Sequence, residues 1–138
     1  MIEIERIPKD AWIAMSEKAH LIAFDTHKPV ETERIDFACL IKCGHQLLGY
    51  GTFKEMDSGT LYWQFGGAFP GTKDSSMSFK GYQALVDWCG RKYERVYTYI
   101  ENTNLVMLKF AMKVGYRITG IRNYKGNILL EHLLEFKE

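Results

Sequence analysis

Three residues in the first half of the chain have side chains that commonly bind metals. Cys39, Cys43 and His45 form the pattern Cys-x-x-x-Cys-x-His, which matches half of the ligand set of a structural zinc site. A second pair of ligands does not follow at a workable spacing. Residues i and i+4 of a strand point to the same face, so both cysteines can instead pack in a core. We therefore predict buried thiols and no metal.

Groups that can transfer protons lie further along the chain. Tyr62 and Tyr116 carry hydroxyls, and Glu101 carries a carboxylate that can act through a water molecule. An aromatic residue at strand spacing more often belongs to a core, and a glutamate at a strand end is often only solvated. These side chains can transfer protons, and the structural role is the alternative for each of the three.

A polar segment before a predicted helix has the features of an anion site. Lys73 supplies positive charge, and Ser75 and Ser76 lie where the helix is expected to begin. Free backbone N–H groups at a helix start attract phosphate groups. Asp74 acts against this by repelling an anion.

Length and charge limit the class of protein. The 138 residues fit a single domain over residues 1–138, with 46% hydrophobic and 14% aromatic residues, so a disordered chain is excluded. The 18 basic and 17 acidic residues give a net charge of +1, which argues against a nucleic-acid partner. The charge is unevenly spread. Residues 104–127 contain no acid and five bases, which either face an anion or form an ordinary solvated surface: Lys109, Lys113, Arg117, Arg122 and Lys125.

Hydrophobic periodicity and turn residues predict ten elements. Strands are expected at residues 2–7, 34–42, 46–54, 60–69, 95–101, 116–124 and 128–136, and helices at residues 9–23, from Ser76 or Ser78 to about 89, and from Asn104 to Gly115. The order predicts an antiparallel meander, a βαβ crossover and a closing hairpin. The expected fold class is α/β (α+β), a mixed and mostly antiparallel sheet with helices on both faces.

The sequence also carries signals about location. No positively charged, apolar leader opens the chain, and no apolar run approaches the ~20 residues of a membrane span. Three cysteines cannot all pair with one another. We therefore expect a soluble, non-secreted protein without a membrane span, in a reducing compartment.

The segment from Asn104 to Tyr116 resembles the late motif of the GNAT acetyltransferase superfamily. In that family an Asn opens a helix with an apolar residue at each turn, and Lys-x-Gly-aromatic leads into the next strand. Asn104, Lys113, Gly115 and Tyr116 match this motif in register. The predicted element order is similar to that family over nearly the whole chain.

The resemblance implies that acetyl-CoA binds where the last meander strand and the next strand separate. Gly66 and Gly67 lie where the family has a bulge that frees backbone groups for the acyl and pantetheine amides. The pyrophosphate is expected at the start of the following helix. The implied cofactor contacts are Gly66, Gly67, Lys73, Ser75, Ser76 and Asn104.

The sequence departs from the family at the chemically important positions. A gapless count puts Met77 and Phe79 near the two glycines of the family's phosphate loop, where side chains would crowd a pyrophosphate. Ala111 stands where many relatives have a tyrosine acid, and residues 60–69 contain no carboxylate base. The resemblance therefore leaves Tyr62, Glu101 and Tyr116 as the catalytic candidates. We therefore expect acetyl-CoA binding to be weakened or lost.

Two functions follow from this resemblance. The chain is also similar to small GNAT-like proteins of short-tailed bacteriophages, of the internal virion or head-assembly type, through residues 102–104 and 113–115. The first function is a virion-associated or assembly role with phage structural or host proteins, in the virion or the host cytoplasm. The alternative is an active acetyl-CoA-dependent N-acetyltransferase.

Overall fold

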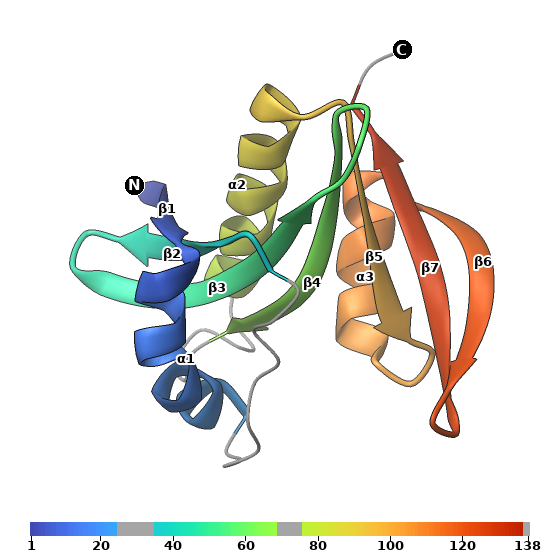
Figure 1. Ribbon diagram of the computed structural model, residues 1–138, viewed down its shortest axis with the longest axis horizontal. Coiled ribbons are helices and arrows are strands. Elements are labelled where there is room, and N and C mark those ends of the chain that lie inside the picture. Colours follow the sequence, from blue (N-terminus) through green and yellow to red (C-terminus); the bar gives the residue numbers. More distant parts are fainter. Residues whose placement is uncertain (25–34, 69–75, 137–138) are drawn as a thin grey trace.

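The computed structural model describes residues 1–24, 35–68 and 76–136, and its elements follow the predicted order (Figure 1). The strands are β1 (Ile2–Pro8), β2 (Phe37–Cys43), β3 (Gln46–Glu55), β4 (Thr60–Ala68), β5 (Arg95–Glu101), β6 (Arg117–Tyr124) and β7 (Asn127–Glu135). The helices are α1 (Lys9–Phe24), α2 (Ser76–Lys92) and α3 (Leu105–Val114).

All seven strands form one sheet in the order β1-β2-β3-β4-β5-β7-β6. Within the described part of the chain, only the pairing of β4 with β5 is parallel. It follows the crossover through α2, because a parallel connection needs a long return segment. The predicted fold class, a mixed and mostly antiparallel sheet with helices on both faces, is confirmed.

The two faces of the sheet carry different helices. On one face, α1 packs Trp12 against Tyr50 of β3, with ring centroids 4.6 Å apart. On the other face, α2 and α3 cover the main core, which includes Phe53, Leu85 and Ala111. Figure 1 shows α1 beside β1 and β2, and α3 beside β5 and β7. The apolar side chains of α2 and α3 that face the sheet lie in or against this main core.

The ends of α3 agree with the local sequence signals. The Asn104 side chain accepts a hydrogen bond from the N–H of Met107 and so caps the first turn. Gly115 ends the helix at φ 101°, a left-handed conformation that a residue with a Cβ adopts at a cost. The N–H of Tyr116 then donates to the carbonyl of Ala111, so the chain turns directly into β6.

Element ends shift slightly from the predictions. Pro8 is the last residue of β1, paired with Phe37, and α1 starts one residue later at Lys9. The first strand was expected to end at residue 7. β2 begins at Phe37, and β4 ends at Ala68. Within residues 1–24, 35–68 and 76–136, no helix is long and apolar enough to cross a lipid bilayer.

Candidate functional site

β4 and β5 pair over only three residues and then separate. The pairs are Thr60 with Arg95, Leu61 with Val96, and Tyr62 with Tyr97. Beyond them, residues 63–68 pair with β3 on one side, while residues 98–101 pair with β7. The inner edges of these two segments, which we call the splay, therefore have no partner strand among the described residues (Figure 1). Unpaired backbone donors and acceptors can bind a polar ligand.

Two local features lie at the start of the splay. The register of β3 and β4 shifts so that Phe53 opposes Trp63 and Thr52 opposes Phe65, which leaves Gln64 as the extra residue of a β-bulge. A bulge bends its strand and increases its twist. The Thr98 hydroxyl then donates to the carbonyl of Trp63 at 2.8 Å, so a side chain bridges the strands where backbone pairing ends.

The position of this bulge corrects the sequence interpretation. The bulge was expected at Gly66 and Gly67, but these residues pair with Gly51 and Tyr50 of β3. Gly66 is closely packed against a side chain instead. A Cβ at Gly66 would lie 3.2 Å from the Trp63 indole nitrogen, and a Cβ at Gly51 would lie 3.1 Å from it. Gly66 and Gly67 still lie on the splayed part of β4, where backbone contact with a ligand is possible.

The N-terminus of α2 follows the splayed part of β4. α2 begins at Ser76 and has no acidic residue in its first turn, so its helix dipole favours an anion there. Lys73, Ser75 and Asp74 lie outside the described residues. Of the residues of that predicted anion site, only Ser76 belongs to the described part of the chain, as the first residue of α2, and the site stays a prediction.

The two bulky residues expected to crowd a pyrophosphate pack toward the protein. Met77 and Phe79 are partly buried against the main core. The Phe79 ring meets Phe110 of α3 edge-on, with centroids 5.0 Å apart, and Lys113 Nζ lies 4.8 Å from its centroid. These contacts connect the first turns of α2 with α3.

The catalytic candidates separate in the fold. Tyr62 lies at the last paired position before the splay. Glu101 is exposed at the end of β5, where it accepts a hydrogen bond of 3.5 Å from Thr103. Asn104 caps α3 immediately after that turn. Tyr62 and Glu101 therefore border the splay at its two ends, whereas Tyr116 lies in the core.

Tyr116 belongs to a buried polar group that the sequence did not reveal. Burial raises the pKa of its hydroxyl well above the ordinary value, and this hydroxyl interacts with Tyr82 without reaching hydrogen-bond geometry. The ring of His132 lies edge-on to Tyr116 at 6.1 Å. His132 Nδ1 is 2.9 Å from the carbonyl oxygen of Leu130, and its Nε2 has no partner among the described residues. Because the Tyr116 hydroxyl is buried, it cannot act as an acid that exchanges its proton with solvent.

A second group of side chains lies on the opposite face of the sheet. The rings of Tyr62 and Tyr97 stack with centroids 4.9 Å apart, and Tyr99 is edge-on to both, at 6.1 and 6.2 Å. The Tyr99 hydroxyl donates to Glu131 Oε2 at 2.9 Å. We call Tyr62, Tyr97, Tyr99 and Glu131 the tyrosine face. The tyrosine face lies on the same side of the sheet as α1. Tyr62 pairs with Lys54 of β3, and Lys54 shares a face with Tyr50, which packs against α1, because the two residues are four positions apart on one strand.

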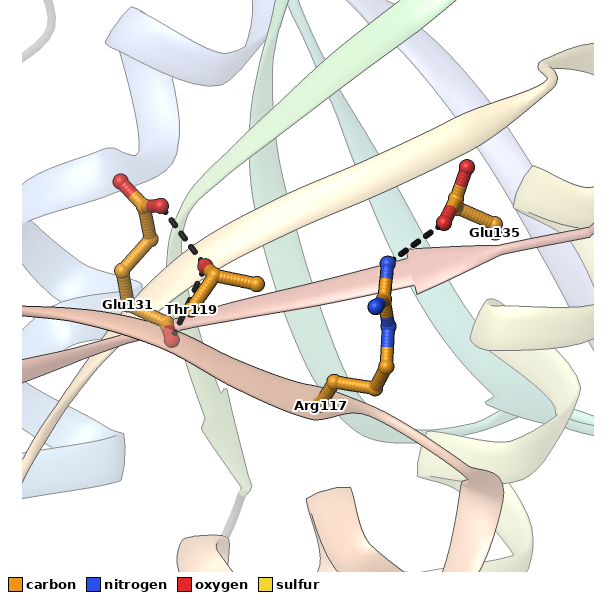
Figure 2. A network of polar contacts seen from close by, with 4 residues as sticks. All are labelled: Arg117, Thr119, Glu131 and Glu135. Atoms are coloured by element: carbon orange, nitrogen blue, oxygen red, sulfur yellow. Dashed lines mark hydrogen bonds and ion pairs between the residues drawn. The ribbon is translucent and has the colours of Figure 1, made fainter.

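Glu131 is fixed by two hydroxyl donors. Thr119 Oγ1 donates to Glu131 Oε1 at 2.7 Å, as Figure 2 shows, and Tyr99 donates to the other oxygen. These hydrogen bonds hold the pKa of the Glu131 carboxyl below its usual value, and the bond from Thr119 has the larger effect. The neighbouring ion pair of Arg117 with Glu135, at 2.6 Å, is separate from this group.

The basic stretch of the sequence does not form one surface. Lys113 of α3 lies over Phe79, while Arg117 pairs with Glu135 and Arg122 Cζ lies 5.1 Å from the Tyr99 centroid. Arg117 and Arg122 of β6 thus make their contacts on the tyrosine side of the sheet, whereas α3 packs on the other face.

The cysteines occupy the predicted strand face. Cys39 is fully buried in the main core, and Cys43 is half-buried against it. Burial raises the pKa of the Cys39 thiol to about 12. His45 is exposed in the turn after β2. Within the described part of the chain, no three His, Cys, Asp or Glu side chains gather closely enough to hold a metal ion.

The sequence contained a partial signal for the tyrosine face. Tyr97 and Tyr99 are two residues apart on a predicted strand, so they share a face. Their partners Tyr62 and Glu131 come from strands 35 and 32 residues away in sequence. Those partners require the sheet order, which places β7 rather than β6 next to β5.

No family model matches the sequence, and no curated protein matches it either. Solved structures do match the fold over the whole chain. An IAA acetyltransferase from Bacillus cereus is 18% identical with a TM-score of 0.75, over 98% of this chain and 99% of that chain. The ribosomal-protein-S18-alanine N-acetyltransferase from Escherichia coli is 11% identical with a TM-score of 0.77, over 100% and 96%. A GNAT family acetyltransferase from Elizabethkingia anophelis with acetyl-CoA bound is 16% identical with a TM-score of 0.70, over 97% of each chain. The chain therefore has the fold of these acetyltransferases.

Proposed function

We propose that this protein is an acetyl-CoA-dependent N-acetyltransferase. The observation that carries the proposal is the separation of β4 from β5 after the pair Tyr62 and Tyr97, which exposes two strand edges in the middle of a sheet. A sheet interior seldom leaves backbone groups unpaired without a purpose. The similar structure from Elizabethkingia anophelis has acetyl-CoA bound, which supports the same ligand class here.

The chain's own groups fit such a ligand. The inner edge of residues 63–68 can hydrogen-bond amide groups, and Gly66 presents backbone without a side chain. The start of α2 lacks acidic residues and can attract phosphate groups. The contact of Phe79 with Phe110 directs that bulky ring at α3. These features support binding, although the loop lacks the family's glycine pattern.

Bound acetyl-CoA would supply an activated acyl group as a thioester. In the overall transfer, the acceptor nitrogen forms a bond to the acyl carbon and the carbon–sulfur bond breaks. The ammonium group of the acceptor loses two protons, one of which ends on the thiol and the other in solvent. Ala111, at the position where relatives have a tyrosine acid, is buried and carries no hydroxyl. We therefore assign the role of proton donor to Tyr62, which lies at the start of the splay.

Calorimetric titration with acetyl-CoA tests the proposal. Saturable binding is expected, together with release of CoA in the presence of a panel of primary amines, followed by mass spectrometry. Tyr62→Phe should lower turnover about 10²-fold or more, the usual range for a general acid, with little change in acetyl-CoA affinity. Tyr124→Phe, which alters an exposed tyrosine at the tip of the β6–β7 hairpin, serves as the matched control. Absence of saturable binding at millimolar acetyl-CoA would exclude the enzyme.

A non-catalytic assembly role is the second candidate. The edge strand β6 favours it, because Ile118 and Ile121 are 57% and 75% exposed there. An edge strand with exposed apolar residues can pair with another chain. The partners would be phage structural or host proteins, in the virion or the host cytoplasm.

Copurification separates the two roles. An assembly protein should remain with phage particles, and Ile121→Lys should release it while leaving the fold intact. A protein that stays entirely in the soluble fraction and turns over acetyl-CoA would contradict the assembly role.

A further inference from the structure

The tyrosine face combines aromatic rings with a fixed carboxylate. Tyr62, Tyr97 and Tyr99 are only partly buried, so their rings remain accessible in part. Both oxygens of Glu131 accept hydrogen bonds from hydroxyls, which orient the carboxylate without neutralising it. Aromatic rings beside a carboxylate attract organic cations, through the ring quadrupole and through charge.

A cation already occupies part of this face. The Arg122 guanidinium lies over the Tyr99 ring and is exposed. It comes from the same chain, and it shows that the face accepts a planar organic cation. Tyr62 and Tyr97 stack on each other further along the face.

The charges around the face are mixed. Glu101 lies two residues after Tyr99 on β5, on the same side of the sheet, and pairs with Leu129, so a second carboxylate belongs to the residue diagonal to Glu131. Lys54 is the cross-strand neighbour of Tyr62. The carboxylates therefore lie along β5 and β7, and the lysine lies on the β3 side. A cation is attracted most strongly near Tyr99 and Glu131.

The position of the face relates it to the splay. Tyr62 and Tyr97 form the last β4–β5 pair, and Tyr99 and Glu101 lie on the segment of β5 that borders the splay. α2 and α3 cover the opposite side of the sheet. A ligand on the tyrosine face would thus approach the splay from the side away from the α2 N-terminus.

We propose that the tyrosine face binds an organic ammonium group between the tyrosine rings and Glu131. This inference rests on the proposed function: the tyrosine face holds the amine that receives the acyl group, and Glu131 determines the preference for cationic acceptors. Arg122 competes for the same face, so acceptors must displace its guanidinium from Tyr99.

Choline tests the site without any transfer reaction, because its quaternary nitrogen accepts no acyl group. Calorimetry and the tyrosine NMR signals should show saturable choline binding in the absence of acetyl-CoA. Its uncharged isostere, 3,3-dimethylbutan-1-ol, should bind about two- to fivefold more weakly from the loss of the cation–ring attraction alone, since a cation over an exposed ring contributes about 0.5–1 kcal/mol.

Three variants locate the site. Glu131→Gln should weaken choline binding about fivefold and leave the isostere unchanged. Glu135→Gln removes a carboxylate from the same strand that is paired with Arg117 instead, and it should have no effect. Arg122→Met should strengthen choline binding two- to fivefold because the competing cation is gone.

Equal binding of choline and its isostere, or equal effects of Glu131→Gln and Glu135→Gln, would overturn the cation site. Its failure can be told from failure of the proposed function. Choline binding without acetyl-CoA binding excludes only the enzyme. Acetylation that choline does not inhibit excludes only this acceptor site.

Discussion

The hydroxyl of Thr98 provides a direct test of how the sheet separates. Thr98→Val keeps the shape of the side chain but removes the donor to the Trp63 carbonyl, a hydrogen bond of 2.8 Å. One intramolecular hydrogen bond contributes about 0.5–1.5 kcal/mol. We therefore expect the free energy of unfolding to fall by about 1 kcal/mol, and the Tm to fall by about 4 °C for a domain of this size.

Urea unfolding and thermal denaturation measure this change. Thr103→Val is the control, because the Thr103 hydroxyl is exposed and makes only a 3.5 Å contact with Glu101. It should change the free energy of unfolding by less than about 0.5 kcal/mol. If the bond also fixes the start of the splay, Thr98→Val should weaken acetyl-CoA binding, and Thr103→Val should not.

Thr98→Val could instead behave like Thr103→Val in stability and in ligand binding. The Thr98 bridge would then be incidental, and the bulge at Gln64 alone would explain why the strands part. An unchanged urea m-value is required for either conclusion, because a changed m-value means that the compactness of one of the states has changed.

Three further predictions concern packing, capping and thiol chemistry. Gly51→Ala should lower the free energy of unfolding in urea titrations by about 1–3 kcal/mol, because the new Cβ would meet three side-chain atoms at 3.0–3.1 Å. Gly120→Ala should cost less, because the nearest atom to a Cβ there is 3.7 Å away. Asn104→Ala should cost about 1 kcal/mol by circular dichroism melting, since it removes the α3 cap, and a serine there should retain most of the stability. Among the cysteines, Cys43 should react first with a thiol reagent at pH 8. Burial raises the pKa of the Cys39 thiol to about 12, so Cys39 should stay protonated and unreactive until the protein unfolds. Fast reaction of Cys39 in the folded protein would contradict its burial.

The parts of the fold that the sequence predicted correctly rest on local signals. Asn104 and Gly115 mark the ends of α3 because a cap needs a particular side chain or a particular φ at one position. The strands and the other helices follow from hydrophobic periods of two or three to four residues. Such signals act within about one turn or strand, so they do not depend on the rest of the chain.

The bulge shows where local signals fail. Two consecutive glycines in a strand suggest a bulge, yet Gly66 pairs with Gly51, and the Trp63 indole packs closely against both glycines. Which ring covers which glycine depends on the β3–β4 register. The actual bulge, at Gln64, carries no glycine and so had no compositional signal.

The +5 stretch of the sequence illustrates the same limit for charge. Counted along the chain, its bases suggest one cationic surface suited to an anionic cofactor. In the fold, Lys113 of α3 lies near α2, whereas Arg122 of β6 lies over Tyr99 on the opposite side of the sheet. Under the proposed function, Lys113 lies near the helix start where a phosphate-bearing ligand would bind. Arg122, in contrast, lies on the ring from which an ammonium acceptor would have to displace it. A linear charge count cannot assign these opposing effects, because the turn at Gly115 takes the chain from a helix on one face into the sheet itself.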